Sequence, residues 1–146
     1  MAVKIKWLRS DKNAKVPIKN HPSDSGFDIR SIEDVVLYSS EWKLIKTGVR
    51  VELPNGYDLQ VRGRSGLAYK YGIGVLNAPG TIDTNYRNDI GVILINHSQV
   101  PFKICKGDRI AQLVVSEVID VESVEITEFS DTTDRDLSGF GASGVK

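Results

Sequence analysis

Residues 90–95 read Ile-Gly-Val-Ile-Leu-Ile and contain no polar side chain. A second run, residues 110–115, reads Ile-Ala-Gln-Leu-Val-Val and is interrupted by a single amide. Short runs that are this rich in apolar and β-branched residues indicate strands covered on both faces. In a chain of 146 residues one face can pack on an opposing sheet and the other on a second subunit, so we expect a homo-oligomer.

Shorter alternating runs surround these two and are separated by Gly, Pro, Asn and Asp, which favours an all-β domain. The clearest expected strands are residues 3–8, 27–30, 34–38, 47–53, 57–62, 90–96, 109–118 and 124–129. One helical turn is expected after Arg64, capped by Ser65 and ended by Gly72.

The segment Pro54-Asn55-Gly56 is typical of a tight turn, because Asn and Gly adopt positive φ easily. It predicts a hairpin in which residues 49–53 pair with residues 59–61. No other turn in the sequence carries so strong a signal.

Composition limits the partners. The chain has 40% hydrophobic residues and equal numbers of basic and acidic side chains, 19 of each, which fits one compact domain. A neutral total argues against binding polymeric nucleic acid, which draws on clustered Lys and Arg. No run approaches the ~18 apolar residues of a membrane span, and no secretory signal is seen, so we expect a cytoplasmic or otherwise intracellular protein. One cysteine and two distant histidines offer no metal cluster, and any metal would arrive with a ligand or bind carboxylates.

Charge is divided unequally between the two ends. Residues 1–20 carry six basic side chains and one acidic one, whereas residues 117–136 carry eight acidic and one basic. The ends could lie near each other within or between chains, or both could be solvated faces. We expect a β domain over residues 1–130 and a flexible, Gly-rich tail over residues 131–146.

Four segments could carry chemistry. Arg62-Gly63-Arg64-Ser65-Gly66 offers guanidinium groups and a hydroxyl to a phosphate, although Ser65 could be only a helix cap. Residues 77–87 place one carboxylate among turn formers and are expected to form a tight hairpin, whose backbone groups can read a planar ligand. Asp83 can deprotonate a water there or make a local turn. Gln112 needs a polar partner inside its apolar strand. Residues 135–144 place an arginine and a phenylalanine among glycines, which suits an anion-binding flap or a disordered end.

Together with residues 25–30, and in this order along the chain, these four segments resemble the five motifs of the trimeric dUTPase family, the deoxyuridine triphosphate nucleotidohydrolases. The matching segments span nearly the whole chain and are residues 25–30, 63–68, 80–87, 107–112 and 135–144. The resemblance implies a jelly-roll-like β sandwich with one short helical turn, assembled as a homotrimer with active sites at the subunit interfaces. It further implies hydrolysis of dUTP to dUMP and pyrophosphate, which keeps uracil out of DNA and supplies dUMP for dTMP synthesis.

The resemblance also assigns roles to residues. Uracil and deoxyribose would be bound by Asn77, Gly80, Thr81, Ile82 and Tyr86, and the Tyr86 ring would exclude a 2′-hydroxyl. Asp83 would activate the attacking water. The phosphates would be held by Arg64, Ser65, Gly66 and Gln112, with Asp28 in support. Mg²⁺ would be carried by the triphosphate, without direct protein ligands. Closure of the tail would bring Arg135, Phe140, Gly141, Ala142 and Ser143 to the nucleotide.

The sequence departs from the family mainly in the tail, where Asp136 and Ser138 replace two glycines and Ala142 replaces a hydroxyl residue. Two rivals remain. A deoxycytidine triphosphate deaminase would need a glutamate in the strand at residues 90–96, which contains no acid. Asp83 argues against a non-catalytic module that binds nucleotide or protein, whereas the altered tail keeps that alternative open. Whether the chain is cellular, viral or phage-encoded is left open by the sequence.

Overall fold

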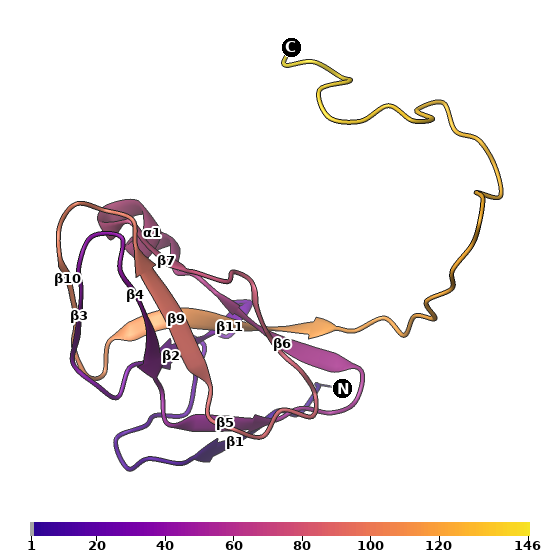
Figure 1. Cartoon of the computed structure of the whole chain (residues 1–146). Coiled ribbons are helices and arrows are strands. Elements are labelled where there is room, and N and C mark those ends of the chain that lie inside the picture. Colours follow the sequence, from indigo (N-terminus) through magenta and orange to yellow (C-terminus); the bar gives the residue numbers. More distant parts are fainter. Residues whose placement is uncertain (1) are drawn as a thin grey trace.

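The computed structural model describes residues 2–146, within which eleven antiparallel strands and one helix form the regular structure (Figure 1). The strands are Lys6–Arg9 (β1), Gly26–Arg30 (β2), Val35–Leu37 (β3), Trp42–Lys46 (β4), Val49–Glu52 (β5), Tyr57–Arg62 (β6), Ile73–Val75 (β7), Gly80–Ile82 (β8), Gly91–Asn96 (β9), Phe102–Ile104 (β10) and Arg109–Glu117 (β11). The helix is Ser65–Tyr71 (α1). The prediction of an all-β fold with one short helical turn is confirmed.

Four sheets enclose one core. The largest has the strand order β2-β11-β6-β8, the second has β4-β9-β7, and β1–β5 and β10–β3 form two-stranded ladders. Every sheet sends apolar side chains into the same cluster, among them Ile29, Ile45, Val51, Leu59 and Ile104. Alternate side chains of the strands fill this core, and the side chains between them point outward, where they can bind a ligand or a neighbouring chain.

The two apolar runs form β9 and β11, as predicted. In β9 the side chains of Val92 and Leu94 are buried, whereas Ile93 and Ile95 are half-buried. The register places Leu44 beside Ile93 and Trp42 beside Ile95, and both β4 side chains are exposed. The outer face of the β4-β9-β7 sheet is therefore apolar and uncovered in the single chain.

The predicted hairpin at Pro54-Asn55-Gly56 is wrong. The turn forms, with Gly56 at φ 87°, but β5 pairs with β1 and β6 pairs with β11 and β8. The turn carries the chain from one sheet to another. Val51 and Leu59 then meet in the shared core from two different sheets, so their alternating pattern is satisfied without a ladder between them.

Helix α1 ends as predicted and begins differently. Gly72 closes it in the left-handed conformation at φ 66°, as the sequence suggested. The cap residue at the start is Arg64, not Ser65, and no side-chain cap bond forms there. Because the Ser65 hydroxyl does not cap the helix, it is left free for another partner.

A β-bulge in β11 decides which side chains face the functional site. Along β2 the register advances by one residue, from Arg30 to Ile29, while β11 advances from Arg109 to Ala111. The extra residue, Ile110, is buried together with Ala111. Without the bulge Arg109 and Gln112, three positions apart, would face opposite sides of the sheet; with it they share one face.

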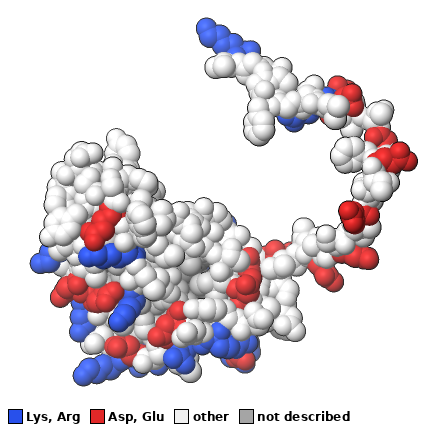
Figure 2. All heavy atoms as spheres, viewed as in Figure 1, with Lys and Arg blue, Asp and Glu red and all other residues white. Residues whose placement is uncertain are grey.

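After β11 the chain leaves the body. Residues from Glu117 to Lys146 are exposed, and residues 118–146 contain no strand or helix, so the strand predicted at residues 124–129 is wrong. A strand needs a neighbouring strand to satisfy its backbone, and this segment has none within the chain. Figure 1 shows the tail running away from the sheets, and Figure 2 shows acidic patches along it and basic patches low on the body. Across residues 2–146, no helix combines the length and apolar character of a membrane span.

Candidate active site

A pocket of about 180 Å³ opens beside the segment that follows β7. Its lining includes five of the residues predicted to bind a base and a sugar: Asn77, Gly80, Thr81, Ile82 and Tyr86. Apolar side chains complete it, namely Val61, Ile90 and Ile93, together with Gly91. The pocket is therefore small, part apolar, and edged by backbone, which suits a flat heterocycle better than a flexible chain.

The hairpin predicted for the pocket segment is wrong, because the strands on its two sides do not pair with each other. Strand β7 pairs with β9, and β8 pairs with β6, so residues 76–79 cross between two sheets. Gly80 makes this crossing close, because a Cβ atom there would stand 3.0 Å from the Val61 Cβ. Backbone groups of the crossing segment can therefore approach a ligand closely.

Asp83 and Tyr86 follow β8 in one loop. The backbone N–H of Tyr86 donates to the carbonyl oxygen of Asp83 at 3.1 Å, and the Tyr86 hydroxyl donates to the carbonyl oxygen of Asp89 at 2.8 Å. Asp83 is exposed, and within the described part of the chain its carboxylate has no hydrogen-bond or ion-pair partner. The carboxylate is therefore available to a water or a ligand.

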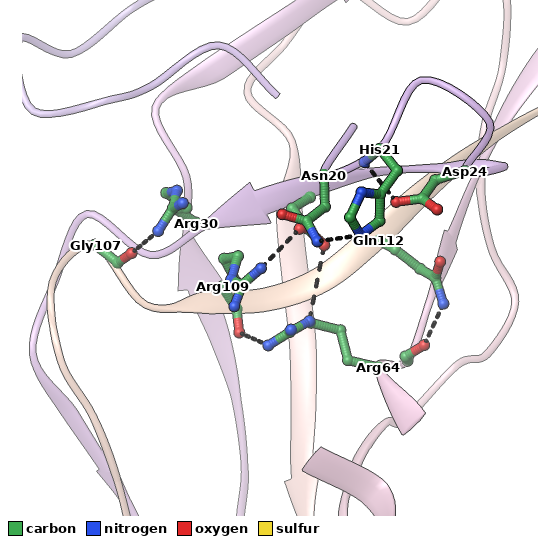
Figure 3. Close-up of polar contacts among 10 residues, drawn as sticks. Asn20, His21, Asp24, Arg30, Arg64, Gly107, Arg109 and Gln112 are labelled. Carbon is green, nitrogen blue, oxygen red and sulfur yellow. Dashed lines mark hydrogen bonds and ion pairs between the residues drawn. The ribbon is translucent and has the colours of Figure 1, made fainter. Parts of the chain in front are cut away.

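A cluster of arginines lies on the outer face of the β2-β11-β6-β8 sheet (Figure 3). Asp28 is at its centre, 3.3 Å from Nη1 of Arg109 and 3.7 Å from Nε of Arg64. Arg64 also donates to the carbonyl oxygen of Arg109 at 3.2 Å, and Arg30 donates to that of Gly107 at 2.7 Å. Three guanidinium groups and one carboxylate leave a surplus of positive charge, which attracts a polyanion.

Gln112 joins this cluster through strand register. It lies opposite Asp28 on one side and opposite Arg62 on the other, and its Nε2 donates to the carbonyl oxygen of Gly63 at 3.0 Å. The absence of a side chain at Gly26 provides the space that its amide occupies. The polar partner that the sequence required for Gln112 is thus the backbone just before Arg64.

The loop before β2 is folded onto the same strand. The backbone N–H of Asp28 donates to the carbonyl oxygen of Ile18 at 2.8 Å. Figure 3 shows Asn20, His21 and Asp24 in this loop, where the His21 N–H donates to Asp24 Oδ2 at 2.8 Å. These contacts fix the approach to Asp28 from the N-terminal side.

The single chain brings the predicted residues together in two groups and leaves the third apart. One group lines the pocket, and the other contains Asp28, Arg64 and Gln112; both rest on β6, where Val61 lines the pocket and Arg62 pairs with Gln112. Ser65 and Gly66 are exposed at the start of α1. The tail residues Arg135, Phe140, Gly141, Ala142 and Ser143 are exposed and lie away from both groups (Figure 1).

Sequence reasoning missed several residues of these two groups. Arg109 and Arg30 belong to the cluster, and Gly91 and Ile93 belong to the pocket lining. Arg109 lay within a segment already singled out, but its side could not be assigned without the bulge. The pocket residues of β9 were read only as apolar strand positions.

Asp89, which follows the Tyr86 loop, has a carboxyl group with a shifted pKa. A hydrogen bond from the Ser10 hydroxyl, and then one from Arg50, lowers the pKa of the Asp89 carboxyl below its ordinary value. Both partners stabilise the charged form. Among residues 2–146, no three His, Cys, Asp or Glu side chains gather as metal ligands do.

Comparison with known proteins gives one consistent result. A model of the dUTPase family matches residues 12–144. The deoxyuridine 5′-triphosphate nucleotidohydrolase of Nautilia profundicola is 48% identical over 97% of this chain and 99% of its own length. That of Crocosphaera subtropica is 49% identical over 98% of this chain and 100% of its own.

Solved structures agree. A mutant dUTPase of Staphylococcus bacteriophage 80alpha, with dUpNHpp, superposes with a TM-score of 0.89 at 31% identity, covering 97% of this chain and 99% of that one. A mutant dUTPase from phage phi11 of S. aureus, described with a structural Mg(II) ion, gives a TM-score of 0.81 at 28% identity, covering 88% and 99%. The fold and the matches together define a nucleotide hydrolase of all-β architecture. The chain belongs to the dUTPase family.

Proposed function

We propose that this protein hydrolyses dUTP to dUMP and pyrophosphate in the two residue groups described above. The observation that carries the proposal is the pairing of a small, base-sized pocket with a positively charged cluster that suits a triphosphate. Val61 of the pocket and Arg62 beside the cluster are successive residues of β6, and their side chains point to opposite faces of the sheet, so one nucleotide would use the pocket of one chain and the cluster of a neighbouring chain.

The base would enter the pocket of about 180 Å³, where backbone groups of residues 77–82 read its hydrogen-bonding edge. Such a close wall excludes a 5-methyl group, and a cytosine amino group would meet the wrong partners. The Tyr86 ring would lie against the deoxyribose and leave no room for a 2′-hydroxyl. These features support dUTP over dTTP, dCTP and UTP.

The phosphates would be held by Arg64, Ser65, Gly66 and Gln112. The hydroxyl of Ser65 is free of a capping role. The contact of 3.7 Å between Arg64 and Asp28 is longer than a hydrogen bond, so the Arg64 guanidinium can turn toward an added anion. Asp28 would support the cluster by holding Arg109 and Arg64 in place before the nucleotide arrives.

Asp83 would act as the general base. Its carboxylate takes a proton from a water, the water oxygen forms a bond to the α-phosphorus, and the bond from that phosphorus to the bridging oxygen breaks. The electron pair leaves with the pyrophosphate. The exposed carboxylate of Asp83, beside the pocket wall at Ile82 and Tyr86, supports this role.

The side chains of the cluster suit a Mg²⁺ ion that is already bound to the triphosphate of the substrate. Asp28 already engages two arginines, so its oxygens are partly satisfied, and the triphosphate itself offers the oxygen ligands that Mg²⁺ prefers. A bound Mg²⁺ supplies positive charge that offsets charge developing on the phosphate oxygens. Asp28 would then support the arginine cluster and would not bind the metal directly.

A jelly-roll homotrimer with shared sites would complete the assembly. The uncovered apolar face around Trp42 and Leu44, and the separation of the tail from both groups, support contributions from neighbouring chains. The flexible tail of residues 131–146 would close over the nucleotide, with Phe140 on the uracil and Arg135, Gly141, Ala142 and Ser143 near the γ-phosphate. In the cell the reaction would keep uracil out of DNA and supply dUMP for dTMP synthesis.

The test is pyrophosphate release with Mg²⁺ from dUTP, dCTP, dTTP and UTP at equal concentration. Rapid release from dUTP alone is expected. Ammonia release from dCTP would indicate the deaminase instead, and binding of dUTP without turnover would indicate the non-catalytic module. Sizing by light scattering in the same buffer tests the trimer.

A further inference from the structure

We propose that Asp89 is a positioning residue for Tyr86, and that its carboxylate contacts set how strongly the pocket discriminates against a ribonucleotide. The role presupposes the proposed function, because it concerns the same pocket. Nothing in the family motifs quoted above assigns it, and it follows from three sets of contacts.

The first set anchors Asp89 to a distant part of the chain. Its Oδ1 accepts a hydrogen bond from the Ser10 hydroxyl at 2.6 Å and another from Nε of Arg50 at 2.8 Å. Ser10 directly follows β1, and Arg50 lies in β5, which pairs with β1. The loop after β8 is therefore tied to the β1–β5 ladder through one carboxylate oxygen.

The second set of contacts connects Asp89 to the Tyr86 ring. The Tyr86 hydroxyl donates to the carbonyl oxygen of Asp89 at 2.8 Å, and the Tyr86 N–H donates to Asp83 at 3.1 Å. The Asp89 N–H is itself held by Oδ1 of Asn88 at 2.8 Å. Tyr86 is thus held by one contact at its backbone and one at its side-chain hydroxyl, and the hydroxyl contact depends on where the Asp89 backbone lies.

The third observation is what surrounds the ring. Tyr86 is 40% exposed, and together with Ile90 and Gly91 it lines both the small pocket and a second one of about 530 Å³. The second pocket also includes Ser10 and Asp89. Because open space adjoins the ring, close packing constrains it weakly, and the hydrogen bond from its hydroxyl to the Asp89 carbonyl oxygen would set its position.

Asp89→Ala removes both carboxylate contacts. We expect kcat for dUTP to stay within about 2-fold, its KM to rise about 5-fold, and the ratio of kcat/KM for dUTP over UTP to fall about 10-fold. Ser10→Ala removes one contact without changing charge, and the same ratio should fall by about 3-fold. In a Tyr86→Phe background, Asp89→Ala should change the ratio by less than about 2-fold, because the link is already cut.

Glu41→Ala is the matched control. Like Asp89, Glu41 has a carboxylate with one hydrogen-bond donor and one basic partner, here the backbone N–H of Tyr38 at 2.8 Å and Nζ of Lys43 at 3.2 Å, but it does not line either pocket. Its ratio should match that of the wild type. If wild-type protein turns over dUTP and Asp89→Ala behaves like Glu41→Ala, the positioning role is refuted. An equal effect of Asp89→Ala with and without the Tyr86 hydroxyl also refutes it. Wild-type protein that does not hydrolyse dUTP refutes the proposed function itself.

Discussion

A side chain on Gly26 would overlap the amide of Gln112, so the position of Gln112 depends on the absence of a Cβ atom across the strand pair. Gly26→Ala should push the amide aside and break its 3.0 Å bond to the carbonyl oxygen of Gly63. The displaced oxygen ends a flexible side chain and can move, but the Gln112 Cβ would stand only 3.1 Å from the new methyl group, so a small loss of stability is expected as well. We expect the KM for dUTP to rise by about 10-fold, measured by pyrophosphate release. A wild-type KM would show that Gln112 is not needed there.

Asp83→Asn should leave the fold and dUTP binding intact while lowering turnover at least ~10²-fold, because it removes the proposed base. Asp34→Asn is a suitable control, since Asp34 is exposed and its oxygen accepts the Lys106 N–H, which an amide can also do. Calorimetry with a non-hydrolysable dUTP analogue separates binding from turnover. Near-normal turnover of Asp83→Asn would require another base.

Deletion of residues 135–146 should preserve the oligomer and slow hydrolysis. The segment is exposed and contributes no residue to the core cluster, so its loss costs little packing. Light scattering and pyrophosphate release would be measured on the same sample. A truncated protein that runs as a monomer would make the tail an assembly element.

Asp136 adopts φ 44°, a conformation that costs a residue other than glycine roughly 1 kcal/mol, and its charge would lie near the triphosphate. Asp136→Gly should relieve both and raise kcat/KM for dUTP about 3- to 10-fold. Asp136→Asn removes the charge while keeping a side chain, so it separates the two causes. A decrease in kcat/KM for both variants would contradict this view of the tail.

The lowered pKa of Asp89 predicts that the stability of the protein depends on pH. Its pKa in the folded protein is lowered below the ordinary 3.8, chiefly by the bond from Ser10, so its stabilising effect is present above that value. The effect is lost as the pH falls through the lowered pKa. The difference in Tm between wild type and Asp89→Ala should therefore be constant near neutral pH and shrink below about pH 4. A difference that grows in acid would contradict this assignment.

The sequence predicted the parts of the fold that depend on local pattern. Alternation and apolar runs located β6, β9 and β11, and Gly72 ended the helix as expected. The same reasoning failed at Gly56, where a turn signal could not say whether the next strand pairs or crosses to another sheet. It missed β4, because two lysines and the exposed Trp42 and Leu44 obscure the pattern of a strand in which only Ile45 is buried.

The candidate site divides in the same way. Motif order placed Gly80 and Tyr86 at one pocket, and Asp28 and Gln112 in one cluster, before any geometry was known. Contacts between residues far apart in the chain, such as Ser10 with Asp89, leave no trace in local composition. The segment at residues 124–129 has a strand-like pattern, but a strand also requires a partner, and the sequence cannot say which chain provides one.

The bulge at Ile110 shifts the alternation of side chains between the two faces of β11 by one residue. Upstream of it Arg109 faces the arginine cluster, and downstream the even-numbered residue Gln112 does. Deletion of Ile110 would restore regular alternation along β11 and still leave Arg109 and Gln112 on one face. Deletion of Leu113 would instead move the side chain of every later residue of the strand to the opposite face. Changes of chain length in this strand are thus unequal in their consequences. Insertions and deletions in relatives should be tolerated at the bulge and purged a few residues beyond it.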